Sequence, residues 1–172
     1  TGTVVFKDIN VGTTSSNPKN LTNVNGTLFF SASDGVNGTE LWKSDGTETG
    51  TVVVKDIDVG VTSSNPTNLT NINGTLFFSA SDGVNGIELW KSDGTEAGTM
   101  MVKDIFAGSI TSNPKLMTNV NGTLFLSAND GVNGAELWKS DGTETGTVMV
   151  KDINAGAGSS SPSHLVNVNG SL

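Results

Sequence analysis

The most regular feature of the chain is a succession of short apolar runs and turn-forming residues that returns every 48 residues. The stretch from residue 25 to residue 47, NGTLFFSASDGVNGTELWKSDGT, recurs with few changes at 73–95 and at 121–143. Trp42, Trp90 and Trp138 mark the same period. A fixed period of this length is typical of propellers and solenoids, so the fold is best predicted from the repeat.

Each unit contains four candidate strands separated by turn signals. In the first complete set these strands cover 20–24, 27–33, 40–44 and 51–57, and the last is rich in β-branched residues. The Asn25-Gly26 dipeptide predicts a tight hairpin, because both residues tolerate positive φ. Three consecutive hairpins make a four-stranded antiparallel meander, and no helical period appears along the chain.

The second strand is apolar on both faces, because Leu28, Phe29 and Phe30 follow one another. Such a strand belongs to a sheet packed between two neighbours, so we expect an all-β fold of β-propeller-type blades. A β-solenoid is the rival, but its strands stack in parallel, whereas the hairpin turns reverse the chain within each unit.

The period divides the chain into about three and a half repeats within one continuous repeat domain: 1–48, 49–96, 97–144 and the partial repeat 145–172. By this division, residues 3–9 are a fourth strand and residues 164–168 a first strand. Three full blades are fewer than the four to eight of the usual ring. We therefore expect the segment to be part of a larger ring, or to assemble with further copies or further repeats.

Three strings carry a resemblance: ELWKSDGTETGT at 40–51, ELWKSDGTEAGT at 88–99 and ELWKSDGTETGT at 136–147. With NGTLFFSASDG, they resemble the ELWxxDGT repeat proteins of bacteria over the whole chain. The resemblance implies a large, exported protein with a propeller-like fold, located outside the cell or at its surface. It implies no activity for any particular residue.

Charge and composition limit the classes of partner that the chain is expected to bind. There are 17 Asp and Glu residues against 9 Lys and Arg, which gives a net charge of −8. Nucleic acids and anionic membranes attract basic surfaces, so neither is an expected partner. No apolar run approaches the ~20 residues of a membrane-spanning helix, so membrane insertion is not expected. Cysteine is absent, which excludes disulfides and thiolate metal sites.

One acidic pattern in each unit is a candidate calcium site. An Asp, an Asn and a Glu recur at D-x-x-N-x-x-E spacing around a glycine-rich turn, and hard oxygen ligands at short spacing suit Ca²⁺. The alternative is that the Asp and Asn bind the amides of their own turn. The candidate ligands are Asp34, Asn37, Glu40, Asp82, Asn85, Glu88, Asp130, Asn133 and Glu136.

Two further motifs have structural interpretations. Each Trp lies in a strand, where we expect it to fill the space between blades with its N–H bonded to a neighbouring loop; the alternative is an exposed platform for sugar rings. Asp45-Gly46-Thr47 and its copies predict a turn in which Asp accepts backbone N–H groups.

The chain offers little for catalysis. It has one histidine, His164, and no cysteine, and carboxylates that recur in every unit are typical of structure rather than of a single active site. We therefore expect a non-enzymatic structural or interaction module that associates with itself, without a cofactor. The alternative is a lectin-like or calcium-dependent propeller with one shallow glycan site per blade.

Overall fold

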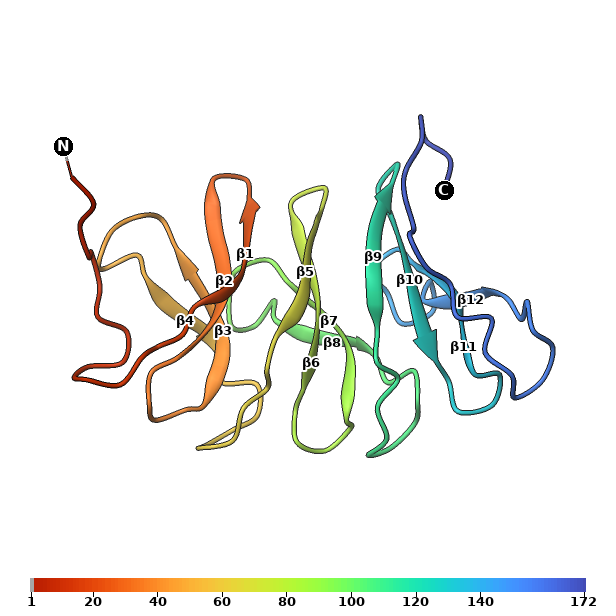
Figure 1. Cartoon of the computed structure of the whole chain (residues 1–172), viewed down its shortest axis with the longest axis horizontal. Helices are drawn as coiled ribbons and strands as arrows, with labels where there is room; N and C mark the ends of the chain where they lie inside the picture. The colour runs from red at the N-terminus through yellow and green to blue at the C-terminus, as the bar shows by residue number, and fades with distance from the viewer. Residues whose placement is uncertain (1) are drawn as a thin grey trace.

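The computed structural model describes residues 2–172 and shows three four-stranded antiparallel sheets in a row (Figure 1). Each sheet is a meander whose strands pair in chain order. The first sheet contains β1 (Lys19–Val24), β2 (Thr27–Ser33), β3 (Thr39–Ser44) and β4 (Val52–Lys55). The second contains β5 (Thr67–Ile72), β6 (Thr75–Ser81), β7 (Ile87–Ser92) and β8 (Met100–Lys103). The third contains β9 (Lys115–Val120), β10 (Thr123–Asn129), β11 (Ala135–Ser140) and β12 (Val148–Lys151).

The predicted Asn-Gly hairpins are confirmed. Val24 pairs with Thr27, so Asn25 and Gly26 alone form the turn between β1 and β2. Their φ angles are 51° and 88°, which is the left-handed conformation that a two-residue hairpin turn requires. The expected antiparallel meander follows in all three units, and the parallel stacking of a solenoid is not found among the described residues.

The sheets stack face to face and converge along their first strands. Contacts between strands of different sheets are made chiefly by β1 with β5 and by β5 with β9, while β4, β8 and β12 form the opposite edges. The stack is therefore narrower along the first strands, as expected for blade-like units. The row does not close into a ring, and the two termini lie at its opposite ends (Figure 1).

The core lies between the sheets. Phe29 points toward the second sheet and packs with Phe78 and Trp90, whereas its neighbour Phe30 packs with Trp42 on the other face. This confirms that the second strand is apolar on both sides. Between the second and third sheets, Phe77 and Trp138 hold the equivalent positions. Phe78 is fully buried, which contributes roughly 1.5–3 kcal/mol to stability.

The prediction of a strand near each end of the chain is wrong. Residues 3–9 form no strand, and residues 164–168 contribute only an isolated bridge between Val168 and Ser171. A strand needs a hydrogen-bonded neighbour, and the third strand beside 3–9 and the second strand beside 164–168 are missing from this segment of the repeat. Both segments nevertheless lie along the end sheets.

The fourth strand is also shorter than predicted, since β4 covers Val52–Lys55 rather than 51–57. The amide of Ile57 donates to the side chain of Glu40 instead of to a strand backbone. Each sheet also crosses the boundaries at which the repeat was divided, because β4 lies beyond residue 48. No helix of the described residues is long and apolar enough to cross a membrane.

Candidate functional site

The loop between the second and third strands lies against the connection that leads to the next sheet. Thr39, at the start of β3, donates its amide to Ser63 Oγ over 2.9 Å and accepts the amide of Asn65 over 3.1 Å. The amide of Ser81, at the end of β6, donates to the carbonyl of Ser64 over 3.0 Å. The candidate calcium ligands therefore lie beside a polar loop at one end of each sheet.

In each unit the Asp and the Asn bind each other and their own turn. Asp82 Oδ1 accepts the amides of Val84 and Asn85 over 2.9 and 2.8 Å, and Asp82 Oδ2 accepts the side-chain N–H of Asn85 over 2.7 Å. The pairs Asp34 with Asn37 and Asp130 with Asn133 repeat these bonds. Both carboxylate oxygens are thus already hydrogen-bonded within the loop.

The glutamate of the pattern is directed elsewhere. Glu88 is fully buried; its Oε1 accepts the amide of Ser112 over 2.9 Å, and its Oε2 accepts the Ile105 amide over 2.9 Å and Ser112 Oγ over 2.6 Å. Three donors from the connection therefore converge on one carboxylate of β7. Glu40 and Glu136 make the same three bonds in the other units.

The D-x-x-N-x-x-E pattern is consequently divided between two structures. The Asp and Asn shape a turn, and the Glu fastens the third strand to the connection that follows the sheet. Among residues 2–172, no three His, Cys, Asp or Glu side chains are grouped so that they could hold a metal ion. Calcium binding, and glycan binding at the same loops, stay predictions.

The pKa values of these carboxyl groups shift in opposite directions. Burial raises the pKa of Glu88, against hydrogen bonds from Ser112 and Ile105, and the charge of Asp104 raises it further; Glu40 behaves alike. Burial also opposes ionisation of Asp82, but the bonds from Asn85 and Val84 together outweigh it and lower its pKa. Each position thus has its own response to pH.

Glu136 differs from its two counterparts. Burial opposes its ionisation as well, but hydrogen bonds from Ser160 and Ile153 outweigh this effect and lower its pKa. Ile153 is 56% exposed, whereas Ile105 in the same position of the preceding unit is 6% exposed. The last unit therefore surrounds its glutamate with less protein.

These directions predict a maximum in stability at mildly acidic pH. The raised pKa values of Glu40 and Glu88 give a contribution that is fully present below their ordinary value of 4.5 and is lost as the pH rises through the raised values. The lowered pKa values of Asp34, Asp82 and Asp130 give a contribution that is present above 3.8 and is lost as the pH falls through the lowered values. We expect the unfolding temperature to rise as the pH falls through the raised pKa values of Glu40 and Glu88 toward about 4.5, and to fall below about pH 3.8.

A matched variant tests whether these aspartates cause the loss of stability below about pH 3.8, here called the acidic limb. Replacing Asp34, Asp82 and Asp130 together by Asn keeps an oxygen acceptor in each turn and removes the ionisable group. Thermal unfolding followed by circular dichroism should then show a shallower loss below about pH 3.8. An acidic limb as steep as that of the unchanged protein would rule out these three carboxylates as its source.

The structure confirms the predicted Asp-Gly-Thr turns, in which the Asp side chain accepts a backbone N–H group. Asp93 Oδ1 accepts the amide of Thr95 over 2.8 Å and its hydroxyl over 2.7 Å, and the copies at Asp45 and Asp141 do the same. These bonds lower the pKa of Asp93, with the side chain of Thr95 as the largest cause. The motif is a turn held by its own side chains.

The tryptophans are buried, but one part of their prediction is wrong. Trp42, Trp90 and Trp138 are each 6% exposed, so none presents a platform for a sugar ring. Their Nε1 atoms are buried and have no hydrogen-bond partner among the described residues, whereas a bond to a neighbouring loop was expected. The indole contributes by packing, as in the pair of Trp90 and Phe78, whose ring centroids are 6.5 Å apart.

Sequence reasoning missed a set of lysines that join one sheet to the next. Lys43 Nζ donates to the carbonyl of Gly94 over 2.8 Å, and Lys55 Nζ donates to the carbonyl of Thr99 over 2.9 Å. Lys91 and Lys103 make the same bonds to Gly142 and Thr147. The only signal in the sequence is that these lysines and their acceptors recur with the period.

Taken together, the polar side chains that recur in every unit bind the turns, the connections and the neighbouring sheet. Comparison with models of protein families, with curated proteins and with solved structures finds no match for this chain.

Proposed function

We propose that this chain is a non-enzymatic structural module whose blade-like sheets add to one another in an extracellular or cell-surface protein of bacteria. One observation carries the proposal: the recurring polar side chains are used to hold the array together. Glu88 ties a strand to the connection between sheets, and Lys43 and Lys55 tie one sheet to the next. We call the contact between two neighbouring sheets a joint. Each unit carries one side of a joint on each of its two faces, so a module of this kind grows by adding units.

The location rests on the resemblance to the ELWxxDGT repeat proteins, which implies export. The absence of cysteine and the net charge of −8 are compatible with a polar surface outside the cell. Ring formation is part of the proposal as well. Sheets that converge along their first strands form a wedge, and wedges of this kind close into a propeller when four to eight are present.

The proposal predicts self-association. Multi-angle light scattering after size-exclusion chromatography at micromolar concentration should give a mass above the 17.7 kDa of one chain, and the mass should increase with concentration. A 17.7 kDa monomer that persists over the whole concentration range and unfolds cooperatively would contradict this function.

A further inference from the structure

The face of the third sheet that points away from the second sheet is apolar and only partly covered. We call it the C-terminal face, and it contains Phe125, Leu137, Val150 and Ile153. Val150 is 44% exposed and Ile153 is 56% exposed. Inside the array the same positions are buried: Val54 and Val102 are each 6% exposed, and Ile57 and Ile105 are 5% and 6% exposed. The C-terminal face thus lacks the sheet that covers its two counterparts.

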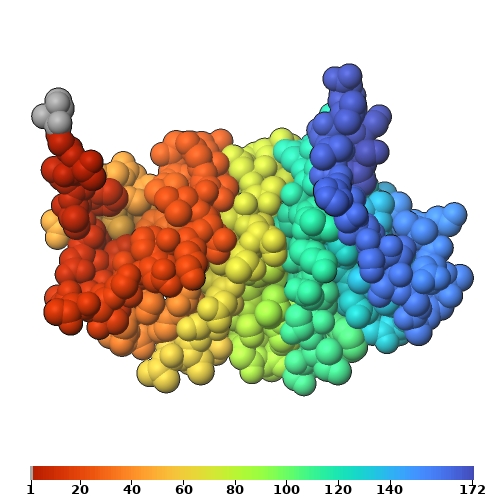
Figure 2. Space-filling model, in the orientation of Figure 1, coloured from red at the N-terminus to blue at the C-terminus, as the bar shows by residue number. Residues whose placement is uncertain are grey.

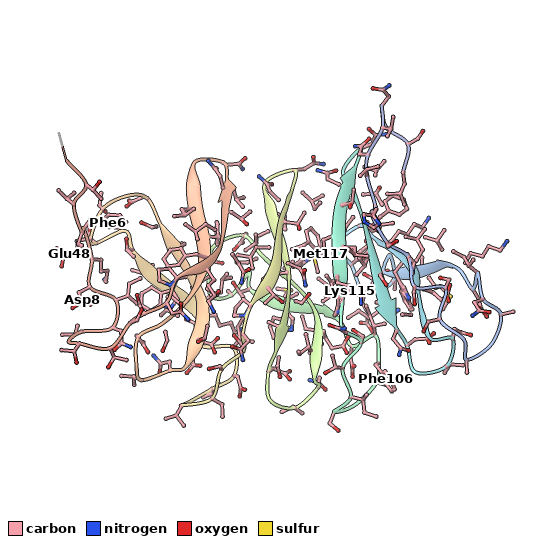
Figure 3. All side chains as sticks on the ribbon, viewed as in Figure 1. Phe6, Asp8, Glu48, Phe106, Lys115 and Met117 are labelled. Carbon is pink, nitrogen blue, oxygen red and sulfur yellow. The ribbon has the colours of Figure 1, made fainter. Side chains whose placement is uncertain are left out.

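The opposite end of the row has the complementary surface. We call it the N-terminal face, the side of the first sheet that contains Leu21, Leu28 and Phe30. A groove of about 270 Å³ lies between these residues and the N-terminal segment, which contributes Phe6 and Ile9. Phe6 lies at this end of the molecule (Figure 3), and Figure 2 shows the two terminal segments at opposite ends of the stack.

Inside the array, the residue equivalent to Leu21 packs against the preceding sheet. Leu69 lies against the cluster between the first and second sheets, and Met117 lies against the cluster between the second and third sheets (Figure 3). Leu21 itself is 62% exposed. The N-terminal segment therefore covers the part of the N-terminal face around Phe30, which is 4% exposed and packs with Ile9, but leaves Leu21 uncovered.

A phenylalanine and a glycine form a steric match at each internal joint. A Cβ added to Gly94 would lie 3.1 Å from Phe29 Cζ, and one added to Gly142 would lie 3.0 Å from Phe77 Cζ, so each ring rests on a glycine of the next sheet. Gly46, the equivalent glycine of the first sheet, has open space at this position. Phe125, the equivalent ring of the third sheet, is only half-buried.

The hydrogen-bond donors and acceptors that link neighbouring sheets are also found at opposite ends of the row, the donors on the third sheet and the acceptors on the first. Lys139 and Lys151 occupy the positions of the lysines that cross the internal joints, and both are exposed in the third sheet. The carbonyls of Gly46 and Thr51 occupy the positions of the acceptors in the first sheet. The N-terminal segment takes up a nearby site, where Lys7 Nζ donates to the Glu48 carbonyl over 3.4 Å.

We propose that the C-terminal face receives the N-terminal face of a second copy of this chain, so that copies join head to tail with one polarity. This inference deepens the proposed function and rests on it. Phe125 would rest on Gly46 of the second copy, and Lys139 and Lys151 would donate to its Gly46 and Thr51 carbonyls. The two faces form a heterologous pair, which extends or closes an array rather than ending at a two-fold dimer.

The C-terminal segment, residues 162–172, holds the place of the incoming first strand. The hydroxyl of Thr118 donates to the Leu165 carbonyl over 3.1 Å, as Thr22 donates to the carbonyl of Leu69 over 3.2 Å inside the array. Asn167 donates to the carbonyl of Asn119 as Asn71 donates to that of Asn23. Strand β1 of the second copy would therefore displace this segment by making equivalent bonds. In the second copy the N-terminal segment, whose Ile9 packs against Phe30 and Trp42, would in turn give way to Ile153 of the first copy.

The test uses two blocking variants and one control. The double variant Val150→Glu, Ile153→Glu places two charges on the C-terminal face, and Leu21→Glu places one on the N-terminal face. All three side chains are exposed in the single chain, so we expect these variants to keep the unfolding temperature of the unchanged protein. Val132→Glu is the control, because Val132 is 68% exposed in the loop between β10 and β11.

Light scattering should show that each blocking variant alone is a monomer and that the control associates like the unchanged protein. An equimolar mixture of the two blocking variants should form a complex of about 35 kDa, twice 17.7 kDa, and no larger species, because each copy keeps one free face. If the unchanged protein associates, two results would overturn the head-to-tail joint alone. One is that either blocking variant associates as strongly as the unchanged protein, and the other is that the mixture of the two variants stays monomeric. A monomeric unchanged protein would overturn the joint and the proposed function together.

Discussion

Replacing Trp90 by alanine is expected to lower the free energy of unfolding by roughly 3–5 kcal/mol. Trp90 is 6% exposed and lies in the cluster that joins the first two sheets, together with Leu41 and Phe78. Neighbouring side chains come from two different sheets, so they cannot collapse into the space without moving one sheet against the other. The loss therefore includes a cavity in addition to the lost apolar burial.

Urea denaturation followed by tryptophan fluorescence and circular dichroism measures this loss. Val84→Ala is the control, because Val84 is 68% exposed in the loop of the same sheet and its replacement should change stability by less than about 0.5 kcal/mol. A loss below about 1 kcal/mol for Trp90→Ala would show that the indole does not fill the joint.

The exchange of Trp90 for phenylalanine separates packing from hydrogen bonding. The indole N–H of Trp90 is buried without a partner among the described residues, so its removal leaves no acceptor unpaired. Trp90→Phe should therefore cost clearly less than Trp90→Ala, because an aromatic ring remains beside Phe78 and an unsatisfied donor is removed.

The second large effect is expected for Glu88→Gln, which should lower the free energy of unfolding by roughly 1–3 kcal/mol at pH 7. The carboxylate of Glu88 accepts from two amides and one hydroxyl and is fully buried. Glutamine keeps one oxygen acceptor but directs an NH₂ group at a backbone N–H of Ser112 or Ile105. That amide then loses its acceptor away from water.

A variant with the same change of charge at an exposed site provides the reference. Glu96 lies in the turn between β7 and β8, and its side chain is exposed, so Glu96→Gln should leave stability almost unchanged. Denaturation at pH 7 compares the two. Equal stability of Glu88→Gln and Glu96→Gln would mean that the three donors are not what Glu88 contributes to the fold.

Much of the fold could be predicted from the sequence, because the signals are local. Asn25-Gly26 closes a hairpin through the backbone conformations that these two residues allow. Adjacent Phe29 and Phe30 must point to opposite faces of a strand, so a sheet covered on both sides follows directly. The Asp45 turn was equally predictable, because its bonds reach only to Thr47.

The candidate site was less predictable, because its bonds join residues that are distant in the chain. Binding of Asp34 and Asn37 to the amides of their own turn was one of two alternatives, the other being a calcium site, whereas the acceptor role of Glu40 depends on Ser64, 24 residues later. Lys43 reaches Gly94 across 51 residues. A carboxylate or an ammonium group in a repeat can bind its own turn or the next sheet, and only the positions of the donors and acceptors in space decide between them.

The sequence by itself determined that the chain is all-β, that each unit is an antiparallel meander, and that its second strand is buried on both faces. These properties follow from turn conformations and from the two-residue alternation of a strand, which act within a few residues. The tertiary structure alone decided which strand-like segments are paired and which core-like side chains are covered. Residues 3–9 and 164–168 have the sequence of strands but form none, and Val150 and Ile153 have the sequence of a core but are exposed. Strand pairing and burial both require a neighbouring sheet, and a repeat pattern carries no information on whether that neighbour is present.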